Sequence, residues 1–254
     1  MMNNWTYEET VVAFWTYCRI PFKKCNSRHP EIIRVAKLIG RSPSALNMKI
    51  GNLGRLDPDL RLHGISGLTR GSQLDKEVWM DFSATPDELA YEAQKILARL
   101  SNEDVVKVSG LDLENLPEGK EREIVVKKRI GQQFFHNAVI TSYNNICCIS
   151  GVSNRGRLDA CHIADWAEKE SHRTNPCNGL CMNPFFHRAY DSFYLGISPD
   201  YKIHVSESLI FSTSQEDFRN YLKLLQGKEI SMPDRFFPDK DLLAEHYDKY
   251  RQTL

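Results

Sequence analysis

Two stretches in the C-terminal half of the chain decide the fold: LDACHIADW at residues 158–166 and RTNPCNGLCMNPFFHRAYDSFYLGISPDYKIHVS at residues 173–206. The first stretch is a short β-like run that contains His162. The second stretch begins with a turn in which Asn178 precedes a Gly-Leu pair. Taken alone, a histidine on a strand is more often packed or solvated than catalytic. Its combination with the polar residues of the second stretch is more informative.

His187 and Asp191 lie four residues apart on a predicted short helix after the turn. At this spacing two side chains face the same side of a helix, so an imidazole and a carboxylate can reach one divalent cation. A strand histidine, a turn asparagine and this pair could therefore converge on one metal ion.

The composition is that of a globular protein. The 254 residues contain 33 Lys and Arg against 33 Asp and Glu, and 41% are hydrophobic. These values exclude disordered, collagen-like and low-complexity chains. There is no uninterrupted apolar run of the roughly 18 residues that a membrane span needs, and the N-terminus lacks the pattern of a signal peptide. Seven cysteines at irregular spacing do not form a disulfide framework, so we expect reduced thiols in a cytoplasmic protein.

The zero net charge hides an uneven distribution. Residues 19–70 carry eleven Lys or Arg against three acidic residues, whereas residues 83–123 carry five against ten. Residues 124–188 are basic again, with eight against four. Two basic segments separated by an acidic one are typical of two surfaces that contact a polyanion, although charges also cluster by chance.

The N-terminal half is predicted to be mainly helical, with helices over residues 30–39 and 43–53 joined by a tight turn. Ser42 can cap the second helix and Pro43 suits its first position. This helix-turn-helix can place its second helix in a DNA major groove, and the alternative is a helical hairpin in a core. The candidate DNA-binding residues of this half are Arg41, Asn47, Lys49, Asn52, Arg55 and Arg70.

The chain is predicted to be an α+β protein with two domains. Residues 101–123 are acidic and contain Gly and Pro, which indicates a linker between a helical DNA-binding domain at 1–100 and a second domain at 124–254. A helix over 86–100 should begin at a capping box in Thr-Pro-Asp-Glu. The further elements expected are a helix over 125–143, two strands around a turn at 198–200, and helices near 215–225 and 239–250.

Three motifs in this order resemble the HNH endonucleases of the ββα-metal superfamily. They are Ala-Cys-His-Ile at 160–163, Asn-Pro-Cys-Asn-Gly-Leu at 175–180 and His-Arg-Ala-Tyr-Asp at 187–191. The resemblance covers about residues 145–206, a quarter of the chain, and implies a ββα-metal core with flanking helices. Residues 5–82 also look like a helical module that precedes such nuclease domains in restriction-like proteins.

The resemblance implies hydrolysis of a DNA phosphodiester to 5′-phosphate and 3′-hydroxyl ends. His162 would be the general base that accepts a proton from the attacking water. Asn178 would orient the loop beside the base strand. A single divalent ion, Mg²⁺ or Mn²⁺, would stabilise the charge of the transition state, with His187 as its first ligand and Asp191 as its second.

One departure from the family concerns the residue before the base, which is Cys161 here and a metal ligand in many relatives. A thiolate is a poor partner for Mg²⁺, so we expect Cys161 not to bind the ion. Asp159 points to the same side of the strand and either supplies the missing carboxylate or orients a neighbour. The cysteines lack the spacing of zinc knuckles, which favours buried thiols over structural zinc.

Arg173 and Arg188 flank the predicted site and could clamp a phosphate, although either could be an ordinary surface arginine. The leading hypothesis is a metal-dependent endonuclease for double-stranded DNA, of restriction or phage-defence type. Cutting both strands with one active centre per chain usually needs two chains, so the hypothesis includes a homodimer. The alternative is a DNA-binding protein whose HNH fold is a catalytically silent scaffold.

Overall fold

The first half of the chain folds around helix α1 (Tyr7–Arg19). Thr6 accepts a hydrogen bond from the backbone of Glu9, and the Glu9 side chain accepts one from the backbone of Thr6, so a capping box fixes where the helix begins. Residues 10–18 are all buried, as expected of a helix that is surrounded by others. Helices α2, α3, α5, α6 and α8 all contact α1.

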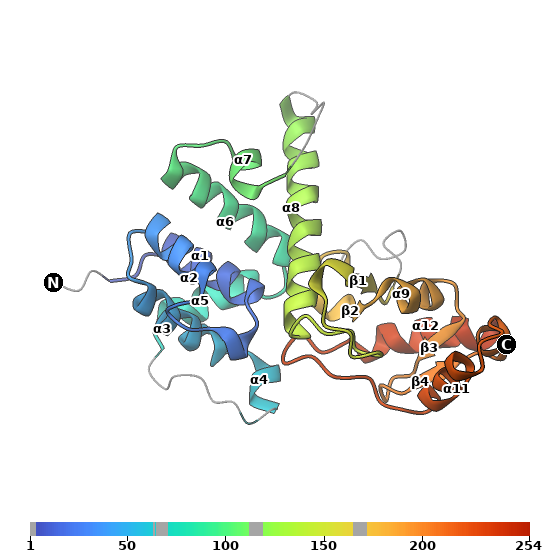
Figure 1. Ribbon diagram of the computed structural model, residues 1–254. Coiled ribbons are helices and arrows are strands. Elements are labelled where there is room, and N and C mark those ends of the chain that lie inside the picture. The colour runs from blue at the N-terminus through green and yellow to red at the C-terminus, as the bar shows by residue number, and fades with distance from the viewer. Residues whose placement is uncertain (1–3, 63, 65–70, 112–118, 165–171) are drawn as a thin grey trace. The chain divides into compact units, whose positions relative to one another are not determined.

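The computed structural model describes residues 4–62, 64, 71–111, 119–164 and 172–254, which divide into units at 1–142 and 143–254 (Figure 1). In the described part of the first unit the regular structure is helical. Besides α1 its helices are α2 (Pro30–Leu38), α3 (Pro43–Gly54), α4 (Pro58–Leu62), α5 (Gln73–Phe82), α6 (Pro86–Ser101), α7 (Val105–Ser109) and α8 (Gly119–Ser142).

Helices α2 and α3 confirm the predicted helical pair. The hydroxyl of Ser42 accepts from the backbone N–H of Ala45 at 3.2 Å, and Pro43 is the first helical residue. The turn between the helices contains Gly40 at a φ of 67°, a left-handed conformation that glycine adopts without strain. One predicted cap is wrong: the Thr85 hydroxyl does not cap α6 and instead donates to the carbonyl of Asp81 at 3.3 Å.

The two units divide at a different position from the one that the sequence suggests. Helix α7 lies inside the expected linker and packs on α6, and α8 begins at Gly119 and packs on α6 and α1. Near its end, Thr141 donates to the carbonyl of Cys18 at 3.3 Å. These contacts place residues 124–142 in the first unit, whereas the sequence pattern predicts a second domain that begins at 124.

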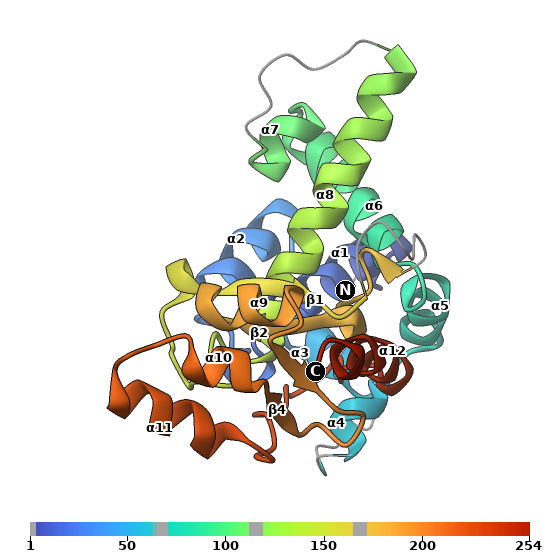
Figure 2. The ribbon, with the colours of Figure 1, turned by 90° about the vertical axis from the view of Figure 1, so that its right-hand side faces the viewer.

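The second unit begins with an antiparallel pair of strands, β1 (Asp159–His162) and β2 (Gly179–Met182). Their register places Cys161 opposite Leu180. Helix α9 (Pro184–Asp191) follows at once and contacts both strands (Figure 2). Its first turn is capped by Asn183, whose side-chain oxygen accepts from the backbone of Phe186 at 3.0 Å.

A second strand pair and three helices complete this unit. Strands β3 (Leu195–Ile197) and β4 (Ile203–Val205) form the predicted hairpin and are followed by α10 (Glu207–Phe211), α11 (Glu216–Leu225) and α12 (Lys240–Gln252). Helix α12 packs against β3 so closely that a Cβ on Gly196 would lie 2.7 Å from the ring of Tyr250. None of the described helices combines the length and the apolar character that crossing a bilayer requires.

Lys49 is buried rather than available to DNA. Only 3% of its side chain is exposed, and its ammonium forms an ion pair with the fully buried carboxylate of Asp75 on α5. The prediction that Lys49 contacts DNA is therefore wrong, because an ammonium in the interior of the unit cannot reach a phosphate.

Replacing Lys49 with alanine should lower the free energy of unfolding by about 3 to 5 kcal/mol, because it leaves the Asp75 carboxylate buried without its counter-ion. Lys95→Ala, which removes a surface ion pair with Glu92, should cost about 0 to 1 kcal/mol. Urea unfolding of both variants and the wild type measures the difference. Equal losses in the two variants would contradict this account of the pair.

Candidate active site

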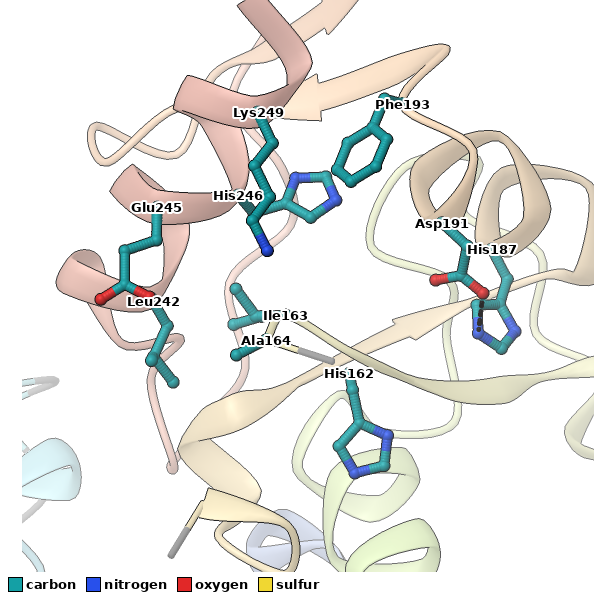
Figure 3. Close-up of a pocket in the computed structure, with 10 residues that line it drawn as sticks. All are labelled: His162, Ile163, Ala164, His187, Asp191, Phe193, Leu242, Glu245, His246 and Lys249. Atoms are coloured by element: carbon teal, nitrogen blue, oxygen red, sulfur yellow. Dashed lines mark ion pairs between the residues drawn. The ribbon is translucent and has the colours of Figure 1, made fainter. Parts of the chain in front are cut away.

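Side chains alternate along β1, so adjacent residues of this strand face opposite sides of the hairpin. Cys161 and Asp159 share one side, and Cys161 is fully buried whereas 42% of the Asp159 side chain is exposed. His162, the last residue of the strand, points away from His187 and Asp191 (Figure 3). The ring of the predicted base is thus not directed at the predicted metal ligands on α9, although all three residues border the same hollow.

Cys161, His187 and Asp191 form a cluster of three different ligand types. Their ligand atoms all lie within 4.8 Å of one another, and in the described part of the chain this is the group of metal-binding side chains that meets that spacing. The Nε2 atom of His187 lies 3.3 Å from Asp191 Oδ2, and the Cys161 thiol lies 3.7 Å from Asp191 Oδ1. Ligands of a tetrahedral ion are roughly 3.5 Å apart, so small side-chain movements would suit the cluster to one ion.

Asp159 contacts His187 from the other side of the ring. Its Oδ2 atom lies 3.1 Å from His187 Nδ1. A neutral imidazole that donates from Nδ1 to this carboxylate carries its lone pair on Nε2, the atom nearest Asp191. Carboxylates commonly orient metal-binding histidines in this way. Of the two roles that the sequence leaves open for Asp159, the geometry favours orienting a neighbour.

Burial raises the pKa of the Cys161 thiol well above its usual range, and the carboxylate of Asp191 raises the pKa further. The side chain is therefore a protonated thiol at neutral pH in the absence of a cation. A cation that binds sulfur would have to displace this proton, as metal ions do in other cysteine sites.

Asn178 is 1% exposed and connects the two ends of the loop that leaves β1. Its side-chain oxygen accepts from the backbone N–H of Ala164 at 2.8 Å, and its amide nitrogen donates to the carbonyl of His172 at 3.1 Å. Its backbone carbonyl accepts from Ile163 at 3.0 Å. The side chain therefore holds the loop directly beside His162.

The His162 ring is positioned by a backbone carbonyl. Its Nε2 atom lies 3.0 Å from the carbonyl oxygen of Arg173. A neutral ring that donates from Nε2 to this carbonyl carries its lone pair on Nδ1, where it can accept a proton. Arg173, predicted to clamp phosphate through its guanidinium, contacts the site through its backbone.

A comparison with known families matches residues 147–198 to the family described as HNH endonuclease. This segment contains β1, β2 and α9 with all of the residues just described. It is an HNH endonuclease domain. No curated protein matches the chain.

The HNH domain of this chain has a hollow of about 570 Å³ that His162, His187 and Asp191 line together with residues of α12 (Figure 3). Lys249 and His246 of α12 both face this hollow. Helix α12 lies outside the matched segment, and no sequence motif contains its histidine. Only the i,i+3 spacing of the two residues could have indicated a shared face.

Arg188 does not line this hollow. It is exposed on α9 and contributes instead to a separate depression with Phe185 and Ser192. One residue after His187, it is rotated by about 100° around the helix axis. Its predicted role in the catalytic centre stays a prediction, since an exposed guanidinium on α9 could still contact a phosphate from outside the hollow.

The predicted DNA-binding residues of the first unit are only partly available. Arg41 is occupied by two hydrogen bonds to the Glu9 carboxylate, both 2.8 Å. Arg55 lies against the backbone at Gly71. Asn47 and Asn52 on α3 are half-buried, and Arg70 lies outside the described residues.

Cys147 is a buried thiol that serves the backbone. Its sulfur accepts from the backbone N–H groups of Ser150 and Asn183, both at 3.4 Å. It thus joins the turn before β1 to the turn before α9. These contacts give the thiol a structural role of its own.

His246 provides a pH-dependent test of the packing. It stacks on Tyr190, with ring centroids 3.7 Å apart, and burial lowers the pKa of His246 to about 4, although the backbone of Tyr190 opposes this shift. The unfolded state therefore takes up a proton near pH 6.5 that the folded state resists. Stability should be complete above about pH 6.5 and should fall by about 2 kcal/mol from pH 7 to pH 5.

His246→Phe keeps an aromatic ring in the stack and removes the titrating group. Urea unfolding at several pH values should show that the variant lacks the loss of about 2 kcal/mol that this residue causes. The same pH dependence in both proteins would show that His246 does not control it.

Proposed function

We propose that this protein is a metal-dependent endonuclease that hydrolyses phosphodiester bonds of double-stranded DNA and leaves 5′-phosphate and 3′-hydroxyl ends. The observation that carries this proposal is the HNH endonuclease domain at 147–198, in which β1, β2 and α9 bring His162, His187 and Asp191 to one hollow. A role in restriction or phage defence is proposed because residues 5–82 resemble helical modules that precede HNH nuclease domains in restriction-like proteins.

His162 is proposed to be the general base. Its ring donates from Nε2 to the Arg173 carbonyl, and the resulting tautomer can accept the proton of the attacking water at Nδ1. An imidazole suits this task because its ordinary pKa lies near neutrality. Asn178 acts as a positioning residue, since its buried amide fixes the loop on both sides of this ring.

His187 and Asp191 are proposed to hold a divalent ion in the hollow, with Asp159 orienting the His187 ring. The mixture of nitrogen and oxygen donors around an open position fits such an ion. When bound, it supplies charge stabilisation for the phosphorane-like transition state and the leaving 3′-oxygen.

The substrate's phosphates are proposed to lie along α12, where Lys249 faces the hollow. In the first unit, α3 remains the proposed DNA-reading helix, although it would act through Asn47 and Asn52 rather than through Lys49. Cleavage of both strands would then require two chains, which a homodimer would provide.

His162→Ala should reduce the rate of DNA cleavage by about 10² to 10⁴-fold while leaving the circular dichroism spectrum unchanged, because it removes the proton acceptor. Supercoiled plasmid and phage DNA are incubated with the protein and Mg²⁺, Mn²⁺, Co²⁺ or Zn²⁺, with EDTA as the metal-free arm. His204→Ala is the matched control, because His204 lies on β4 and does not line the hollow.

Cleavage that continues in EDTA or in His162→Ala would contradict the proposed chemistry. If the protein binds DNA but does not cut it with any of the four metal ions, the alternative of a catalytically silent scaffold is favoured.

Lys249→Gln should weaken DNA binding about five- to tenfold at roughly 0.1 M salt and reduce the salt dependence by about one counter-ion, because it removes one phosphate contact. The matched control is Lys240→Gln on the same helix, where the ammonium lies 5.4 Å from the centroid of the Tyr201 ring. Fluorescence anisotropy with duplex DNA at several salt concentrations measures both effects. An unchanged salt slope in Lys249→Gln would exclude the contact.

A further inference from the structure

We infer that Cys161 is a ligand of the metal ion in the HNH domain, and that it makes this centre select a borderline transition-metal ion such as Zn²⁺ or Co²⁺ over Mg²⁺. This deepens the proposed function and depends on it only in assuming that the centre holds a cation. It also replaces the expectation from sequence that Cys161 takes no part and that the ion is Mg²⁺ or Mn²⁺.

The position of the sulfur carries the first step. Strand alternation places Cys161 on the side of β1 that faces α9, and its thiol reaches the Asp191 carboxylate at 3.7 Å. The same carboxylate lies 3.3 Å from His187 Nε2. Sulfur, nitrogen and oxygen donors therefore surround one point.

The alternative ligand is Asp159, and its contacts point to a different role. Its carboxylate lies 3.1 Å from His187 Nδ1, on the opposite edge of the ring from Nε2. A carboxylate that orients the ring through Nδ1 is not placed to share an ion with Nε2. The third protein donor is thus Cys161, whereas Asp159 acts through His187.

The donor set determines the preference for an ion. Mg²⁺ requires near-octahedral oxygen ligands and gives up water reluctantly, so a sulfur ligand disfavours it. Zn²⁺ and Co²⁺ accept sulfur and imidazole together, and three protein ligands with a fourth open position are the pattern of catalytic zinc. Asp191, whose side chain is 57% exposed, borders the hollow on which that open position would lie.

Cobalt reports the sulfur ligand directly, because a thiolate bound to Co²⁺ gives a charge-transfer absorption band in the near-ultraviolet. The metal-free protein of 254 residues is titrated with Co²⁺ and then with Zn²⁺ or Mg²⁺. We expect the band to saturate at one ion per chain, Zn²⁺ to abolish it, and Mg²⁺ in large excess to leave it unchanged.

Three variants test the assignment. Cys161→Ser should lose the band and bind Co²⁺ about 10²-fold more weakly, and Cys161→Asp should lose the band and gain affinity for Mg²⁺. Cys181→Ser is the matched control. Cys181 is also a buried thiol, but it lies on β2 opposite Ala160 and not opposite Cys161. This variant should keep the band. Circular dichroism verifies that each variant is folded.

Cobalt binding without the band, or a band that persists in Cys161→Ser, would overturn the inference, as would the absence of Co²⁺ binding by the wild type. The outcome is separate from that of the nuclease assay. A protein that shows the band and cuts no DNA would keep this inference and lose the proposed function. A protein that cuts DNA with Mg²⁺ and shows no band would keep the proposed function and lose this inference.

Discussion

The buried amide of Asn178 is the interaction on which the geometry of the second unit depends. Four residue pairs join β1 to β2, and a two-stranded hairpin of that size is marginal by itself. Asn178 adds side-chain hydrogen bonds from the start of β2 to Ala164 and His172, the two described ends of the loop. Since these groups are buried, an apolar residue at this position would leave backbone donors and acceptors unsatisfied in the interior.

With the loop held by this amide, one short strand carries the residues of both proposed tasks. Adjacent residues of β1 face opposite sides, so Cys161 is directed towards α9 while His162 is directed to the backbone of Arg173. The proposed proton acceptor, His162, and the proposed cation ligand, Cys161, therefore lie on opposite sides of the strand. Because the two side chains face opposite sides of β1, each has its own hydrogen-bond partner: Asp191 for Cys161 and the carbonyl of Arg173 for His162.

The local parts of this fold could be predicted from sequence because their causes are local. The cap of α3, the i,i+4 pair on α9 and the strand that ends at His162 all depend on residues within one or two turns of each other. The resemblance to HNH endonucleases likewise depends on three short motifs, at 160–163, 175–180 and 187–191. The same reasoning could not place α8 in the first unit, because that depends on contacts with α1 and α6.

Long-range pairing accounts for the other errors. The burial of Lys49 depends on an aspartate 26 residues further along the chain, which helical periodicity cannot reveal. The stack of His246 on Tyr190 joins α12 to α9, and the histidine carries no motif. Metal chemistry alone argues against Cys161 as a ligand, because the sequence does not reveal that its thiol lies 3.7 Å from the Asp191 carboxylate.

The close fit of Gly196 beneath Tyr250 bears on how this domain can be separated from the rest of the chain. Helix α12 covers β3 and, through His246, the ring of Tyr190. A fragment trimmed to residues 147–198, the extent of the family match, would leave Gly196 and the Tyr190 ring open to water. The smallest piece suited to recombinant expression or transplantation into another protein is therefore the whole second unit through the end of α12.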